Sequence, residues 1–218
     1  MRAVHTFFLL ILTQFSFSQE QDEIEYITKG NPMFLVAKNY FRSNPFNIHF
    51  SAFLNHLTHD PTLSNKTFTK RTNTALFFFQ GDYTTHNPYN FKPDRVEIRL
   101  AERPVNMEDS LSTIDTLLFY QLVGYGYGPA GMESVRKEFA RFDRKYGKNF
   151  YSEDYQLKKD DDVIGMTRNY FLLSATFLSP LSITWAKLDD HQNVFTITFR
   201  IKITENMATL PQPSNGHQ

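Results

Sequence analysis

The strongest constraint on the fold is a strict alternation of apolar and polar side chains near the end of the chain. Over residues 195–204, every odd position is Phe or Ile and every even position is Thr, Arg or Lys. Successive side chains of a strand point to opposite faces, so this segment is predicted to be a strand with one apolar face and one polar face. Such strands are typical of antiparallel sheets that have one face on the core and one face in water.

Four further segments are predicted to be strands. Residues 181–188 are expected to pair with the strand above as an antiparallel hairpin, through the polar loop 189–193. Residues 96–101 alternate in the same way, and residues 75–79 form an apolar run closed by Gly81 and Asp82. Residues 116–123 lead into a glycine-rich stretch. The sequence therefore predicts a mostly antiparallel sheet of about five or six strands.

One long amphipathic helix is predicted over residues 132–146. Its apolar residues recur at steps of three and four, and they are Met132, Val135, Phe139, Phe142 and Tyr146. Basic side chains occupy the opposite side, and Gly147 follows as a C-cap. The helix is therefore expected to cover one face of the sheet.

A pair of N-terminal helices is predicted from two Asn-Pro steps. Asn31-Pro32 and Asn44-Pro45 have the residue types of an N-cap followed by the first helical position. The second helix is expected to end at Asp60-Pro61, before a polar loop over residues 62–73.

Residues 163–178 fit a helix capped by Asp160–Asp162 slightly better than a strand, although their Thr and aromatic content suits a strand as well.

The first 18 residues have the pattern of a cleavable export signal. Arg2 precedes an apolar run over residues 7–12, and Ser16 and Ser18 occupy the minus-three and minus-one positions of a cut before Gln19. The run is too short to span a bilayer, and polar residues follow it at once. No other segment is predicted to cross a membrane. The expected organisation is therefore a signal peptide at 1–18, a single α+β domain at 19–205 without internal repeats, and a disordered tail at 206–218.

Composition narrows the compartment and the partners. The chain has no Cys, so the exported protein has neither disulfides nor a lipid-modified cysteine, which favours the periplasm or the exterior of a Gram-negative bacterium. Lys plus Arg and Asp plus Glu both number 23, so there is no net field that would attract nucleic acid. A glycan, a peptide or an envelope protein is the expected kind of partner.

Three glycines, Gly126, Gly128 and Gly131, have the GxGxxG spacing of a phosphate-binding loop. A dinucleotide site needs a parallel βαβ unit, and the segment after the long helix is too polar for the buried parallel strand of such a unit. Pro129 also removes one amide that would face a phosphate. The glycines are therefore predicted to form a strand-to-helix turn, and no cofactor is expected.

Two groups of side chains are candidates for binding. His56 and His59 lie one turn apart on the second predicted helix, where they could share a metal ion with a carboxylate from elsewhere. Aromatic and histidine side chains in and beside two turns could stack on sugars or bind a peptide. These residues are Tyr83, His86, Tyr89, Phe91, Tyr125 and Tyr127. Packing of these rings against the core is the structural alternative.

No hydrolase motif is present, since the chain has neither a GxSxG elbow nor a Cys nucleophile. The sequence therefore predicts an exported protein with a binding or structural role rather than an enzyme. The alternative is a hydrolase-like or metal-dependent enzyme whose loop-built site surrounds the helix-end histidines.

We expect the exported protein to begin at Gln19, because the small residues before it match the cleavage pattern of a signal peptide. N-terminal sequencing of the protein recovered from the periplasm or the medium checks this. Recovery of the protein inside the cell with residues 1–18 still attached would contradict the prediction.

Overall fold

The computed structural model describes residues 32–46, 48–70, 77–105, 115–172 and 179–202. The predicted signal peptide and the predicted disordered tail lie outside these residues. Within them, the elements follow in the order α2 (Pro32–Tyr40), α3 (Phe50–His59), β1 (Leu63–Lys70), β2 (Phe77–Tyr83), β3 (Arg95–Val105), β4 (Asp115–Tyr127), α4 (Gly128–Tyr146), a 3₁₀ turn η1 (Gly147–Asn149), β5 (Tyr151–Lys159), β6 (Asp162–Phe171), β7 (Leu181–Lys187) and β8 (Gln192–Lys202).

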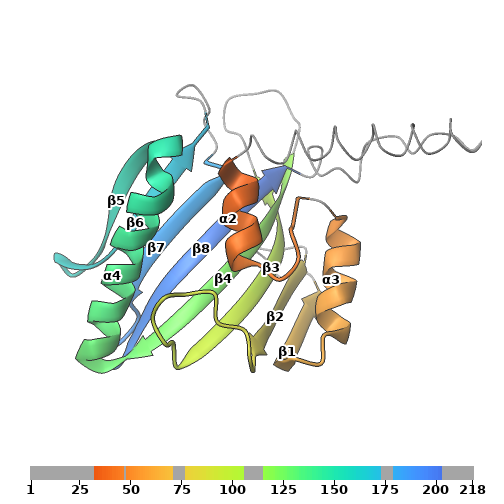
Figure 1. Cartoon of the computed structure of the whole chain (residues 1–218), viewed down its shortest axis with the longest axis horizontal. Coiled ribbons are helices and arrows are strands. Elements are labelled where there is room, and N and C mark those ends of the chain that lie inside the picture. Colours follow the sequence, from red (N-terminus) through yellow and green to blue (C-terminus); the bar gives the residue numbers. More distant parts are fainter. Residues whose placement is uncertain (1–31, 47, 71–76, 106–114, 173–178, 203–218) are drawn as a thin grey trace, which may run out of the picture.

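The strands form one antiparallel sheet in the order β1-β2-β3-β4-β8-β7-β6-β5 (Figure 1). Strands β1 to β4 make one meander and strands β5 to β8 make a second, and the two meet where β4 pairs with β8. Each meander follows a helix, α3 or α4, so the topology repeats although the sequence shows no repeat. The predicted α+β class is confirmed, and the described sheet has eight strands instead of about five or six.

The helices lie together on one face of the sheet (Figure 1). Helix α4 packs across β4, β8 and β7, and its buried Val135 and Phe142 face the sheet as the periodicity predicts. Phe142 lies 6.3 Å from Phe195 of β8 and 5.6 Å from Tyr40 of α2, measured between ring centroids. These rings join both helices to the sheet in one aromatic core.

The N-terminal helical pair is present, but its second helix begins later than the Asn44-Pro45 step predicts. Helix α3 begins at Phe50, whereas the Asn44 side chain accepts a hydrogen bond of 3.0 Å from the amide of Phe46. Asn44 therefore closes a local turn of the kind that competes with helix formation.

The prediction of a loop over residues 62–73 is wrong where the structure describes this segment, because residues 63–70 form strand β1. Its polar side chains are tolerated because β1 is an edge strand.

The helix favoured for residues 163–178 is wrong in its described part, since Asp162–Phe171 is strand β6. Asp160 and Asp161, which were expected to cap that helix, have φ angles of 50° and 70° in the turn between β5 and β6. Asp tolerates this left-handed conformation better than most residues. Tertiary pairing with β5 and β7 decides the structure of a segment whose own pattern is ambiguous. Residues 173–178 lie outside the described ranges.

None of the helices in the described ranges is both long enough and apolar enough to cross a membrane.

We expect Phe139→Ala to lower the free energy of unfolding by about 3–5 kcal/mol. The substitution removes an aromatic ring on the buried side of α4 that is only 7% exposed. Arg144→Ala, on the exposed side of the same helix, is the matched control and should change stability by less than about 0.5 kcal/mol. Urea unfolding followed by the fluorescence of Trp185 measures both. Equal stability of Phe139→Ala and the wild type would show that α4 does not pack as described.

Candidate functional site

The three glycines form the predicted strand-to-helix turn. Strand β4 ends at Tyr127, and α4 begins at Gly128, whose φ of 65° favours glycine. A Cβ atom on Gly126 would lie 2.9 Å from the Cα atom of Gly131, so the strand and the helix touch through their backbones. The side chain of Asn193 donates hydrogen bonds to the carbonyls of Gly126 at 3.1 Å and Gly128 at 3.0 Å. Because every described strand pairing is antiparallel, the βαβ unit of a dinucleotide site is not formed here.

Four of the predicted ligand residues, Tyr83, His86, Tyr89 and Phe91, pack on the helix-covered side of the sheet. Tyr83 and Tyr89 are buried, and His86 and Phe91 are half-buried. Tyr89 stacks on Phe91 with ring centroids 5.5 Å apart, and a Cβ atom on Gly124 would lie 2.6 Å from the Tyr89 ring. The ligand role of these four residues stays a prediction, and their packing gives each of them a place in the core.

His86 also links this loop to α2. Its Nε2 atom lies 3.0 Å from the carbonyl oxygen of Tyr40. Burial lowers the pKa of His86, although the hydrogen bond to Tyr40 opposes that effect. The ring therefore favours its neutral form, which suits a structural hydrogen bond in the core.

The two remaining predicted tyrosines, Tyr125 and Tyr127, lie near the end of β4 but in different surroundings. Tyr125 is buried and faces away from the helices, and Tyr127 is 47% exposed beside the start of α4. The Tyr127 hydroxyl accepts a hydrogen bond of 3.2 Å from Gln192 of β8. Of the six predicted ligand residues, Tyr125 is the one that lines the groove described below.

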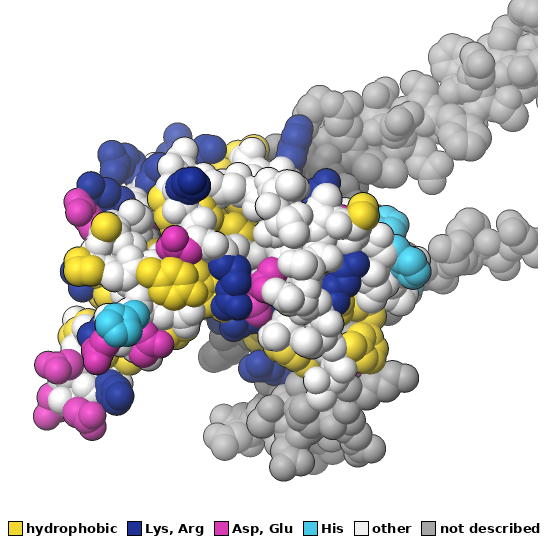
Figure 2. Space-filling view, turned by 90° about the horizontal axis from the view of Figure 1, so that it is seen from below, with side chains coloured by type: hydrophobic (Ala, Val, Ile, Leu, Met, Phe, Trp, Pro, Cys, Tyr) yellow, Lys and Arg dark blue, Asp and Glu magenta, His cyan; other side chains and the backbone are white. Residues whose placement is uncertain are grey.

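The predicted metal ligands His56 and His59 are exposed on α3 and line a shallow pocket of about 440 Å³. Figure 2 shows histidine side chains on the surface of the molecule. The Nδ1 atom of His59 lies 2.8 Å from the carbonyl oxygen of Asn55, one turn earlier in the helix. Asp60 is the one carboxylate in this pocket lining, and it forms an ion pair of 3.2 Å with Arg42. Within the described part of the chain, no three His, Cys, Asp or Glu side chains are grouped so that they could hold a metal ion.

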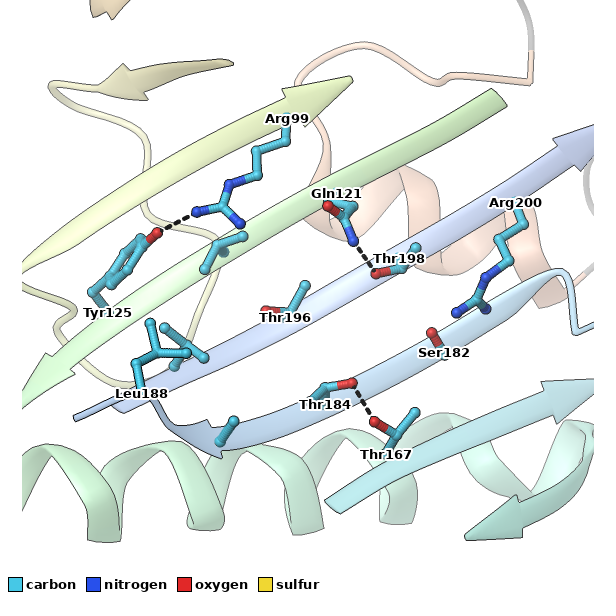
Figure 3. Close-up of a pocket in the computed structure, with 13 residues that line it drawn as sticks. Arg99, Gln121, Tyr125, Thr167, Ser182, Thr184, Leu188, Thr196, Thr198 and Arg200 are labelled. Carbon is cyan, nitrogen blue, oxygen red and sulfur yellow. Dashed lines mark hydrogen bonds between the residues drawn. The ribbon is translucent and has the colours of Figure 1, made fainter. Parts of the chain in front are cut away.

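The face of the sheet opposite the helices carries a groove of about 300 Å³ (Figure 3). Strands β4, β7 and β8 supply most of its floor. At one end it meets a small apolar cluster of Val123, Tyr125, Ala186 and Val194. Every second residue of β8 lines the groove, from Val194 at this apolar end through Thr196 and Thr198 to Arg200.

A row of polar side chains crosses this face from strand to strand, and we call it the polar band. The strand register places its members next to one another, and they are Arg99, Gln121, Thr198, Ser182 and Asn169. Neighbouring strands lie about 4.8 Å apart, so the band spans about 19 Å. Gln121 Nε2 donates a hydrogen bond of 3.1 Å to the Thr198 hydroxyl (Figure 3).

A second row of hydroxyls lies beside the polar band. This threonine row consists of Thr167, Thr184 and Thr196, which are opposite one another on β6, β7 and β8. The hydroxyls of Thr167 and Thr184 are hydrogen-bonded at 2.9 Å. Together the two rows give the groove a floor of hydroxyl and amide groups, each of which can both donate and accept hydrogen bonds.

A buried carboxylate, Glu97, holds the Arg99 end of the polar band in place. Arg99 donates to it through Nε at 2.7 Å, and the Tyr125 hydroxyl donates to it at 2.5 Å. Arg95 lies 3.4 Å from the same carboxylate and stacks 3.9 Å from the centre of the Tyr125 ring. These four side chains form a closed network in which Glu97 partly neutralises two arginines.

The network shifts the pKa of both Glu97 and Tyr125. Burial raises the pKa of Glu97, but the hydrogen bonds from Arg99 and Tyr125 and the nearby positive charges outweigh it, so the pKa lies below its ordinary value. Burial, and then the hydrogen bond to Glu97, raises the pKa of Tyr125 to about 12. At neutral pH, Glu97 is therefore charged and Tyr125 is a neutral donor.

Apart from Tyr125, the residues of the groove were not among the predicted ligand residues. In the sequence, these residues could be recognised as the polar positions of the alternating strands, such as Thr196, Thr198 and Arg200 on one strand and Arg99 on another. That alternation identifies which side chains leave the core. It does not show which strands are neighbours, and the groove depends on that pairing.

We expect Glu97→Gln to lower the free energy of unfolding at pH 7 by about 1.5–3 kcal/mol, the range for hydrogen bonds to charged groups. Because the folded pKa of Glu97 is depressed, its contribution is present above the unfolded pKa of about 4.3 and is lost as the pH falls through the folded pKa. The stability difference between variant and wild type should therefore shrink on acidification. Urea unfolding at pH 7 and at acid pH measures it.

Glu133→Gln on the exposed surface of α4 is the control for this experiment. We expect it to leave the free energy of unfolding at neutral pH nearly unchanged, because exposed ion pairs contribute little. A difference between Glu97→Gln and the wild type that does not depend on pH would contradict the role given to the charged carboxylate.

Scanned against models of protein families, against curated proteins and against solved structures, the chain matches none of them.

Proposed function

We propose that the chain is an exported, non-enzymatic protein that binds a carbohydrate in the groove on the sheet face opposite its helices. Export is supported by the signal-peptide pattern of residues 1–18. Binding is supported by the polar band and the threonine row, whose members apart from Asn169 line the groove from five neighbouring strands.

The observation that carries the proposal is that hydroxyls of the band are enclosed although they face away from the core. Ser182 is 2% exposed and Thr198 is 5% exposed, much less than the polar side chains of a solvated sheet face. Polar groups held in a recess lose part of their contact with bulk water, so a ligand that replaces this water with its own hydrogen bonds is favoured.

The composition of the groove selects among the kinds of ligand. Sites for apolar molecules are lined mostly by hydrophobic side chains, whereas hydroxyl, amide and guanidinium groups predominate over the floor of this groove. A peptide that binds by strand addition needs a free sheet edge, but β4, β7 and β8 are each paired on both sides. A carbohydrate carries many hydroxyls that both donate and accept, and the two polar rows offer the same chemistry.

The histidine pocket on α3 supports the enzymatic alternative less well. Its two imidazoles are exposed on a single helix, and its one lining carboxylate is engaged by Arg42. A catalytic metal site uses three protein ligands as a rule, and the described residues do not bring a third ligand to this pair.

We expect neutral and acidic monosaccharides and disaccharides at millimolar concentration to shift amide resonances of β4, β7 and β8 in ¹⁵N-labelled protein. Thr196→Trp should weaken this binding at least about tenfold, because the indole fills a groove of about 300 Å³. Titrations monitored by NMR measure both effects.

Thr67→Trp, at an exposed position on edge strand β1 of the same sheet, adds the same bulk outside the groove and should leave binding unchanged. If none of the sugars shifts a groove resonance, or if Thr196→Trp binds as the wild type does, the proposal is wrong.

A further inference from the structure

We infer that the carbohydrate is acidic and that Arg200 binds its carboxylate, an inference that rests on the proposed function and specifies the ligand of the same groove. Arg200 extends from β8 at the end of the groove opposite the apolar cluster, where its guanidinium lies beside the Ser182 hydroxyl (Figure 3). The guanidinium donates to the carbonyl of Ser179 at 3.3 Å and lies 5.9 Å from the centre of the Phe119 ring.

The charge of Arg200 is not balanced by any carboxylate in the described part of the chain. Arg95 and Arg99, two other arginines near the groove, both contact Glu97 within ion-pair distance. Among the described residues, no Asp or Glu forms such a pair with Arg200. Burial lowers the pKa of Arg200, because the guanidinium has lost part of its contact with water. An arginine stays charged in proteins, so a negative ligand group would be stabilised here.

The groups around Arg200 fit a carboxylate. A guanidinium binds a planar carboxylate through two parallel hydrogen bonds. The Thr198 hydroxyl already accepts a hydrogen bond from Gln121, so its own proton is left to donate toward the groove. Ser182 provides a second hydroxyl next to Thr198 on β7.

The rest of the polar band suits the hydroxyls of the same sugar. The Oδ1 atom of Asn169 is buried, and no described group donates a hydrogen bond to it. In the strand register Asn169 is next to Ser182, which lines the groove, whereas Asn169 itself lies just outside the groove lining. A ring that carries both a carboxylate and hydroxyls, as in a uronic acid, combines the anion that Arg200 lacks with donors for Asn169. The geometry therefore points to an acidic glycan rather than a neutral one.

The test compares two sugars that differ only in the charged group, methyl β-D-glucuronide and methyl β-D-glucoside. We expect the wild-type protein to bind the glucuronide at least about tenfold more tightly in NMR titrations at low salt. Arg200→Gln should remove this preference, so that the variant binds the two sugars with similar affinity. Added salt should weaken only the glucuronide, because ionic strength screens the charge pair.

Arg103→Gln is the matched control. Arg103 is an exposed arginine that also lies over the Phe119 ring, at 5.2 Å, but it is outside the groove lining. It should keep the full preference for the glucuronide. Thermal unfolding of both variants, within a few degrees of the wild type, shows that each is folded.

The outcomes separate this inference from the proposal on which it rests. If neither sugar binds, the carbohydrate function itself fails. If both bind equally, or if Arg200→Gln keeps the preference, the function stands and the acidic ligand is wrong. An equal loss in Arg103→Gln would reveal non-specific attraction and overturn the inference. Tighter binding of acetyl-dialanine, a peptide with a free carboxylate, would overturn it in favour of a peptide ligand.

Discussion

The pairing of β4 with β8 is the interaction on which the rest of the structure depends. It runs from Leu117 opposite Lys202 to Tyr127 opposite Gln192, and it joins two meanders that would otherwise be separate four-stranded sheets. The same pairing places Gln121 opposite Thr198, so it builds the centre of the polar band. It also ends beside the tight turn into α4, where Gly126 contacts Gly131. A single ladder of hydrogen bonds thus fixes the sheet, the groove and the start of the main helix.

The core and the groove are built from the same strands and share one register. Tyr120 and Leu122 are fully buried toward the helices, while Gln121 between them faces the groove. On β8, Phe199 packs in the core and its neighbours Thr198 and Arg200 line the groove. Because side chains alternate with a period of two, a slip of one residue would move the polar rows into the core. The cost of burying those groups keeps the register fixed, so the stability of the fold also preserves the site.

Charged groups are distributed unevenly over the groove face, so the two ends of the groove differ in their chemistry. At the Arg99 end, Glu97 and the Tyr125 hydroxyl engage the guanidinium and hold it in place. At the other end, Arg200 has a carbonyl and the face of a ring as its described neighbours. The Arg99 end is therefore organised within the protein itself, whereas Arg200 forms no ion pair with a carboxylate of the described residues.

The sequence by itself determined those features that depend on local pattern. The alternation over residues 195–204 predicted a two-faced strand, the steps of three and four over 132–146 predicted α4, and the glycine spacing predicted a strand-to-helix turn. Each follows from side-chain direction or from backbone freedom within a few residues. The sequence pattern gave the wrong structure where pairing between strands decides it. The ambiguous segment 163–171 becomes a strand by pairing with its neighbours, and residues 63–70 become a strand at the edge of the sheet.

Only the tertiary structure decided where the site lies. Four of the six side chains chosen from the sequence pack on the helix-covered side of the sheet, and Tyr89 fits there because Gly124 leaves space for its ring. The groove instead joins Arg99, Gln121 and Arg200, residues far apart in the chain that no short motif connects. Alternation shows that a side chain leaves the core, but strand order and register determine which side chains become neighbours, and both are set by contacts distant in sequence.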